Sequence, residues 1–403
     1  MNKISKEIPM AEKAITTITL KKINREKVYQ YIYQQKITSK LQIVQDLKIG
    51  LSTVSQNLNE LEKDGLITRK GYFESTGGRK AQRIQIVENY RISIGLGILK
   101  DTLHIVAVNV YGDAIATETI ELTYENTDTY YSTLAEKVEL FIQKNHYAHD
   151  TVEGISIATQ GVISPDGTHV TYGDIMQNTN MQLSDFSDKL PYPCHLEHDS
   201  KAAAESELWN HPHLNNAVVY LLNPNLGGAV ITNHEVHQGD HMYSGLIEHV
   251  CIDPQGPACY CGRHGCLETY CSVNALKEAI HMPLKEFFEE LHSAHSSELV
   301  QIWHTYLNHL AFSIQNMNLI IDGPIIISGY LAPFFEEEDM CYLLEEINAN
   351  ALFPVTREHL LLGTRGQYTP AIGVSGSTSK LTSIESLITF QFASSSKRKS
   401  FCT

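Results

Sequence analysis

The chain has 403 residues and carries 31 Lys plus Arg against 46 Asp plus Glu, a net charge of −15, and this length allows two or three domains. Residues 1–91 hold 17 basic and 9 acidic side chains, a balance of +8, whereas residues 92–403 hold 14 and 37, a balance of −23. The apolar content of 42% excludes a mostly disordered chain, and no apolar run approaches the roughly 20 residues of a membrane helix.

The first 20 residues, MNKISKEIPMAEKAITTITL, show no clear periodicity and predict a flexible tail. They contain no continuous apolar stretch of the signal-peptide type, so we expect a cytoplasmic protein without a membrane partner. Cysteines are kept reduced in that compartment, and clusters among the eight cysteines therefore predict metal sites before disulfides.

Residues 21–88 predict three short helices followed by a hairpin. The first helix is expected from a cap at Asn24, and the second follows Ser39 with Leu41, Val44 and Leu47 facing inward. A third helix begins near Ser52 and ends at Gly65. Its apolar residues Val54, Leu58 and Leu61 are spaced i, i+4, i+7, which is typical of an amphipathic helix. The alternating segments LITRKGYF and RKAQRIQIV then predict two strands around a tip at residues 75–80.

This order of elements is typical of a winged helix-turn-helix, in which the third helix enters the major groove of double-stranded DNA. The polar face of that helix and the cations of the hairpin supply the candidate DNA contacts: Ser52, Thr53, Ser55, Gln56, Asn59, Arg69, Lys70, Arg79 and Lys80. The alternative is a small helical protein-docking module. We favour DNA because the polar face carries no acidic residue until Glu60.

The remaining residues predict two similar α/β halves, a first lobe at 89–200 and a second lobe at 201–380. Each half opens with hairpin strands, with turns near Tyr111–Asp113 and Asn233–Glu235. Helices are expected at 129–145, 200–210 and 273–320, and buried strands at 152–159 and 324–329. Residues 381–403 form a C-terminal segment and tail. A duplicated α/β body places its ligand in the cleft between lobes.

The loop at 249–268 holds a strong chemical motif, HVCIDPQGPACYCGRHGCLE. Cys259, Cys261 and Cys266 lie within eight residues, and His249 precedes them. Three thiolates with one imidazole match the tetrahedral ligands of zinc, and four protein ligands indicate a structural site. The alternative is a turn with three reduced cysteines. Spacing alone does not secure His249, because the chain has 19 histidines.

At these residues the sequence resembles the ROK family of repressors, open reading frames and sugar kinases. CYCGRHGCLET is similar to the family's CxCGxxGCxE signature, GISIATQGVISPDG to a segment of its first lobe, and the TGGRK wing to its repressor branch. The resemblance implies a hexokinase/actin-like (ribonuclease H-like) body of two lobes, dimers or tetramers, and a sugar between the lobes. It also implies that His249, Cys259, Cys261 and Cys266 are the zinc ligands.

The resemblance further implies a sugar site that this chain has altered. The family's sugar-binding asparagine corresponds to Asn180, and its Asn-Asp pair to His198 and Asp199. The ExGH motif corresponds to residues 246–249, so the histidine is kept as His249 but the sugar-binding glutamate has become Leu246. A glutamate after the last zinc cysteine is kept as Glu268. The expected effector contacts are thus Asn180, His198, Asp199, His249 and Glu268.

The two stretches of this chain that correspond to the phosphate-binding loops of the family's kinases differ from the kinase sequences. The stretch Ser93–Ile98 replaces a DxGGTK loop and lacks its aspartate, and Asn223–Gly228 replaces a GTGxGGG loop. Pro224 in the second stretch has no N–H to offer a phosphate. Because phosphoryl transfer depends on positioning and stabilising phosphate oxygens, we expect no enzymatic activity.

The sequence therefore predicts a sugar-responsive, DNA-binding transcriptional regulator, in the first place a repressor of carbohydrate-use genes. Its expected partners are a double-stranded DNA operator, a small carbohydrate effector and further copies of itself, as a homodimer or tetramer. Two alternatives remain: an active sugar kinase with a DNA-binding head, and a regulator that answers to a protein partner because its sugar contacts are altered.

Overall fold

The computed structural model describes residues 17–74, 80–294, 296–349 and 351–381. The chain divides into one compact unit that ends at Tyr90 and a second, larger unit at residues 91–381. We had expected the division at 88/89. No helix within the described ranges is long and apolar enough to cross a membrane.

Three helices and a small sheet form the first unit. Its elements are α1 (Thr17–Gln35), β1 (Ile37–Thr38), α2 (Lys40–Leu47), α3 (Leu51–Lys63), β2 (Ile67–Thr68) and β3 (Ile84–Ile86), with the sheet order β1-β3-β2. α1 begins at Thr17, before the expected cap at Asn24, because TITLKKI contains no helix breaker and continues the helix toward the N-terminus. Lys21 of α1 forms an ion pair with Glu60 of α3 at 2.8 Å.

The buried residues predicted from the amphipathic patterns agree with the structure for α3 but only in part for α2. Val54, Leu58 and Leu61 of α3 are all fully buried, as their spacing predicted. On α2 the prediction was wrong for Leu41, which is 60% exposed, while Val44 and Leu47 are half-buried and Ile43 is the buried residue. The helix follows Ser39 as predicted, and the Ser39 hydroxyl caps it by accepting from the Gln42 N–H at 3.3 Å.

The predicted hairpin after α3 is present. β2 pairs antiparallel with β3, and the pairing continues outward through a bridge between Tyr72 and Gln82. The Phe73 N–H donates to the Ala81 carbonyl at 2.9 Å, close to the tip. Residues 75–79 of the tip, including Arg79, lie outside the described residues.

The second unit contains two five-stranded sheets with the same order of strands. The first comprises β4 (Ile92–Ile98), β5 (Thr102–Val108), β6 (Ala114–Glu121), β7 (Val152–Thr159) and β10 (Cys194–His198), ordered β10-β7-β4-β5-β6. The second comprises β11 (Ala217–Leu221), β12 (Gly227–Thr232), β13 (Glu235–Val236), β14 (Ile325–Ser328) and β15 (Leu360–Leu362), ordered β13-β12-β11-β14-β15. In each sheet three antiparallel strands precede two parallel ones, which confirms the predicted duplication.

Each sheet packs against helices. α4 (Asp128–Lys144) supplies buried side chains to the core of the first sheet. The second sheet shares its core with α8 (Val273–Ile280), α9 (Leu284–Ala294), α10 (Ser297–Asn318) and α11 (Glu337–Ala349), around the buried Trp303. The short elements are β8 (Val162–Ile163), β9 (Val170–Tyr172), α5 (Ser184–Ser187), α7 (Glu268–Cys271) and 3-10 turns at His149–Thr151, Ile247–His249, Ala332–Phe334, Arg357–His359 and Gly366–Tyr368.

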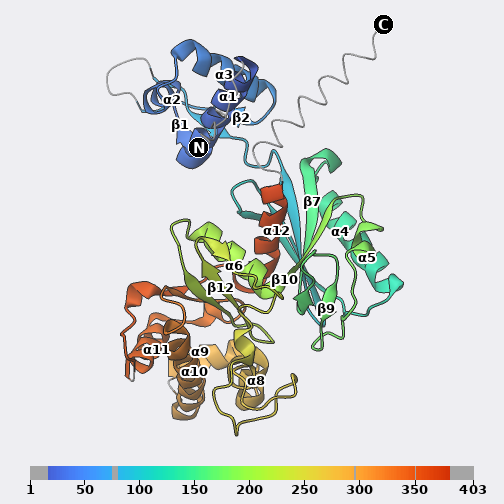
Figure 1. The fold of residues 1–403 in the computed structure, drawn as a ribbon, viewed down its shortest axis with the longest axis vertical. Coiled ribbons are helices and arrows are strands. Elements are labelled where there is room, and N and C mark those ends of the chain that lie inside the picture. Colours follow the sequence, from blue (N-terminus) through green and yellow to red (C-terminus); the bar gives the residue numbers. More distant parts are fainter. Residues whose placement is uncertain (1–16, 75–79, 295, 350, 382–403) are drawn as a thin grey trace, which may run out of the picture. The chain divides into compact units, whose positions relative to one another are not determined.

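The last helix, α12 (Thr369–Leu381), returns to the first sheet. It packs against β4, β7 and α6 (Asp199–Asn210), and Figure 1 shows it beside β7. We had assigned residues up to 380 to the second lobe, so this helix differs from the expected division. The absence of a side chain at Gly95 permits the close approach, because a Cβ there would lie 1.8 Å from the Ala371 carbonyl oxygen.

Candidate ligand cavity and metal centre

A partly open cavity lies where the strands of the first sheet end. β7 and β10 are parallel, with Thr159 opposite His198, so the residues that follow them emerge at the same edge. Gln160 and Gly161 follow β7, and Asp199 begins α6 directly after β10. The second half of the chain contributes Leu226, Leu246, Glu248, His249 and Tyr260 to the lining.

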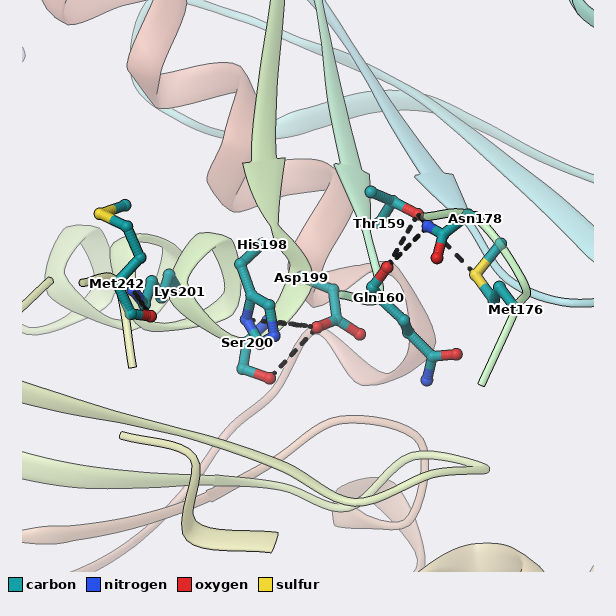
Figure 2. A network of polar contacts seen from close by, with 9 residues as sticks. All are labelled: Thr159, Gln160, Met176, Asn178, His198, Asp199, Ser200, Lys201 and Met242. Atoms are coloured by element: carbon teal, nitrogen blue, oxygen red, sulfur yellow. Dashed lines mark hydrogen bonds and ion pairs between the residues drawn. The ribbon is translucent and has the colours of Figure 1, made fainter. Parts of the chain in front are cut away.

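His198 and Asp199 both line this cavity, as predicted. The Asp199 carboxylate accepts from the Ser200 N–H at 2.7 Å and lies 3.6 Å from the Nδ1 atom of His198. Burial lowers the pKa of His198, and the neighbouring carboxylate of Asp199 opposes this effect only in part. Figure 2 shows the two side chains together, with Lys201 on the other side of His198.

The asparagine in the cavity is Asn178 and not Asn180. Asn178 is fully buried, and its amide donates to the Gln160 carbonyl at 2.8 Å and the Thr159 hydroxyl at 3.2 Å. Its Oδ1 has no hydrogen-bond donor among the described residues. Asn180 is exposed and takes a left-handed conformation, φ 68°, in the turn that follows, which carries its side chain out of the cavity lining. Sequence spacing could not choose between two asparagines in NTN.

Glu248 is a cavity residue that the sequence interpretation missed. It lies in the 3-10 turn Ile247–His249, is only 5% exposed, and its Oε2 has no hydrogen-bond donor among the described residues. Burial raises its pKa well above the usual range. Leu246, which replaces the family's glutamate, also lines the cavity. An acidic residue within the altered ExGH motif was the available signal.

Glu268 does not line the cavity, and its side chain instead binds the loop Asn223–Gly228. Its carboxylate accepts from the Leu226 N–H at 2.6 Å and from the Asn225 side-chain amide at 2.8 Å. The Asn223 side chain accepts from the Tyr330 N–H, so the loop Asn223–Gly228 is tied to its own surroundings. We expected Glu268 to contact a sugar. In the structure Glu268 is the first residue of α7, and its side chain binds this loop and does not line the cavity.

The first stretch compared with a phosphate loop is not a loop. Ser93–Ile98 lies within β4, where it pairs with β5 on one side and β7 on the other. Ala371 of α12 covers it at Gly95. Its backbone N–H groups are therefore engaged in the sheet, and a helix occupies the space in front of them.

His249, Cys259, Cys261 and Cys266 form a cluster whose ligand atoms all lie within 4.8 Å of one another. The Sγ atoms of Cys261 and Cys266 are 3.7 Å apart, close to the ~3.8 Å expected for two sulfurs that bind one tetrahedral zinc at about 2.3 Å. The Nδ1 of His249 lies 3.9 Å from the Cys259 Sγ, while its Nε2 is 3.3 Å from the Tyr260 hydroxyl in the cavity wall. The donor set fits a zinc ion, and His249 borders both this cluster and the cavity.

In the first unit, most of the predicted DNA-contacting residues lie on or beside the exposed face of α3. Ser52, Gln56 and Asn59 are exposed, and Thr53 and Ser55 are half-buried. Arg69 donates to the Asn59 side chain at 2.7 Å, which ties β2 to α3, and Lys70 and Lys80 are exposed.

The chain is thus a duplicated two-lobed α/β body with a cavity at the strand ends and a Cys/His cluster beside it. The model of the ROK family matches residues 92–373, and the chain belongs to this family.

The curated relatives include xylose repressors and a DNA-binding transcriptional dual regulator. The chain is 27% identical over 275 residues to a xylose repressor of Caldicellulosiruptor bescii, covering 67% of this chain and 69% of that protein. It is 22% identical to the xylose repressor of Bacillus subtilis, over 88% and 94% of the two chains. It is also 24% identical to the Escherichia coli DNA-binding transcriptional dual regulator NagC, over 67% of each chain.

Solved structures share the fold. A ROK family transcriptional regulator, a homologue of the Escherichia coli MLC protein, aligns with a TM-score of 0.68 at 20% identity over 89% of this chain and 96% of its own. A ROK family glucokinase of Streptomyces griseus, in complex with glucose and AMPPNP, aligns with a TM-score of 0.61 at 16% identity over 72% of this chain and 99% of its own.

Proposed function

We propose that this protein is a sugar-responsive, DNA-binding transcriptional repressor without kinase activity. The extent of the alignments supports this reading. The Bacillus subtilis xylose repressor and the MLC homologue align over 88% and 89% of the chain, whereas the glucokinase aligns over 72%. A body of 291 residues, 91–381, makes up about that smaller share, so the match to regulators extends beyond it.

The observation that carries the DNA-binding proposal is the construction of α3 and its hairpin. α3 buries Val54, Leu58 and Leu61 and leaves short polar side chains on its other face, which suits a recognition helix in the major groove. The hairpin of β2 and β3 would be the wing of a winged helix-turn-helix, with Lys70 and Lys80 available for phosphates. Two heads in a dimer would read two half-sites of an operator.

The cavity is the proposed effector site. Its polar set is Asn178, His198, Asp199, Glu248 and His249, with Asn178 in place of Asn180 and without Glu268. A sugar can shift the protein between DNA-binding arrangements only if it binds one of them more tightly. α6 begins at Asp199 in the cavity and packs against both α12 and β12, so a change at the cavity can reach both sheets.

The two stretches that correspond to the kinase phosphate loops support the proposal that the protein is not an enzyme. Phosphoryl transfer needs backbone N–H groups and cations around the phosphates. Here the Leu226 N–H is taken by the Glu268 carboxylate, and the stretch at Gly95 lies inside the sheet beneath α12. Asp199 would then serve as a hydrogen-bond acceptor for the effector.

His249, Cys259, Cys261 and Cys266 would hold a structural zinc ion. Zinc would cross-link a loop that has few apolar side chains of its own and would fix the position of His249 at the edge of the cavity.

An electrophoretic mobility shift of the full chain on the DNA upstream of its own gene, titrated with a panel of sugars, tests the proposal. We expect binding in the nanomolar range at moderate salt and a loss of affinity with at least one sugar. Unchanged DNA affinity across the panel would refute the effector role. A coupled assay for ADP release tests the kinase alternative, and sugar-dependent turnover would overturn the non-enzymatic reading.

A further inference from the structure

The polar groups of the cavity that lack partners are mostly acceptors. Glu248 is 95% buried and Asn178 is completely buried, yet Glu248 Oε2 and Asn178 Oδ1 have no donor among the described residues. Asp199 adds a second carboxylate, of which Oδ1 is held by Ser200. A buried acceptor without a donor is costly, so these groups indicate a ligand that brings hydrogen-bond donors.

Positive charge is missing from the same wall. Within the described part of the chain, no lysine or arginine lines this cavity, whereas Asp174, Asp199 and Glu248 do. Figure 2 shows the buried Lys201 on the other side of His198, beside Met242. Lys201 donates to the Met242 carbonyl at 2.8 Å and to the Gln238 carbonyl at 3.3 Å. It lines a second cavity instead.

From this arrangement we propose that the cavity selects an unphosphorylated, uncharged sugar, and that Glu248 is a specificity-determining contact for its hydroxyl groups. This inference rests on the proposed effector function and deepens it. Glu248 lies two positions after Leu246, so a carboxyl group is present in the motif although the expected position is apolar. A sugar hydroxyl can both donate and accept, so it can pair with the Glu248 carboxyl and donate to Asn178 Oδ1, while a phosphate ester carries negative charge and would be repelled by Asp199.

The size of the discrimination follows from Coulomb's law. One negative charge of a phosphate at ~6 Å from the Asp199 carboxylate, with an effective dielectric constant of about 20, weakens binding about 100-fold. We therefore expect the dissociation constant of a phosphate ester to exceed that of its parent sugar by about this factor.

The test uses isothermal titration calorimetry of the full chain with matched pairs. Xylose, glucose and N-acetylglucosamine are compared, the last two also with their 6-phosphates, and thermal shift supplies a second readout. A parent sugar should bind and its ester should bind about 100-fold more weakly. An ester that binds as tightly as its parent overturns the inference but leaves the proposed function intact. If none of these sugars or esters binds, while DNA is still bound, both the inference and the effector role are overturned.

Variants test the role of Glu248 itself. Glu248→Leu should weaken binding of the parent sugar at least about 10-fold, and Glu248→Gln, which keeps an acceptor of the same size, should recover part of the loss. Glu235→Gln is the matched control, because Glu235 is exposed in β13 and lies outside the cavity lining. Unfolding temperatures report whether each variant is folded. Wild-type affinity in a folded Glu248→Leu variant would overturn the assignment.

Discussion

Replacing Gly95 or Gly97 of β4 by alanine adds the same methyl group, but the two substitutions should change the stability of the body differently. At Gly95 a Cβ would lie 1.8 Å from the Ala371 carbonyl oxygen and 2.4 Å from the Ser375 hydroxyl, about 1.5 Å short of an ordinary contact. The obstacle is the backbone of α12, so the helix must move. At Gly97 the nearest atom, the Cβ of His104, is 3.5 Å away, which is ordinary van der Waals contact. Both glycines lie in the same strand with negative or extended φ, so they form a matched pair.

Gly97→Ala should be neutral or stabilise the body by about 0.4–1 kcal/mol, because alanine restricts the unfolded chain. Gly95→Ala gains the same unfolded-state effect but loses about 1–3 kcal/mol through overpacking against α12. The two variants should therefore differ by about 1–3 kcal/mol in the free energy of unfolding.

Guanidinium unfolding followed by tryptophan fluorescence measures this difference. The chain has two tryptophans, Trp209 and Trp303, and both lie in the body, so the signal reports the unit that contains β4. Equal midpoints and slopes for the two variants would contradict the close packing of α12 on β4, and with it the argument that this helix covers the first phosphate-loop stretch.

Three further predictions concern the metal, a buried lysine and the DNA-binding head. Cys266→Ser should retain roughly a tenth or less of the wild-type zinc by atomic emission, while Cys251→Ser, outside the cluster, should keep one ion per chain; equal zinc contents would refute the ligand set. Burial lowers the pKa of Lys201 to about 8, below its unfolded value, so its proton is held less tightly in the folded chain. The stability of the wild type relative to Lys201→Met should therefore be constant below pH 8 and rise by about 3 kcal/mol as the pH approaches 10.5, measured by denaturant titrations at each pH; a difference that falls with pH would oppose this sign. Lys70→Ala should weaken operator and non-specific DNA binding alike and reduce the salt slope by about 1, whereas Lys144→Ala, on α4 of the body, should leave the slope unchanged.

Local patterns predicted the elements that depend on near neighbours in the sequence. The spacing of Val54, Leu58 and Leu61 determined which face of α3 is buried, because a helix repeats every 3.6 residues. The spacing of Cys259, Cys261 and Cys266 brought three thiols together in one short loop. On α2 the same reasoning misplaced Leu41, which is exposed, and missed the buried Ile43, since a helix of eight residues offers too few turns to define a face sharply.

Tertiary structure decided which of the neighbouring polar residues reach the cavity. Asn178 and Asn180 are two positions apart in a turn with left-handed residues, and only the folded turn determines that Asn178 points inward. The role of Glu268 depended on the packing of α7 beside the loop at Leu226, more than 40 residues earlier in the chain.

Composition, periodicity and short spacing were enough to predict the division of charge between a basic head and an acidic body, the two similar halves of the body and the three cysteines of the metal cluster. Only the tertiary structure revealed that α12 covers β4, that Glu268 closes a loop and that Glu248 enters the cavity wall. These features join segments far apart in the chain, and their geometry is set by the packing of whole helices on sheets.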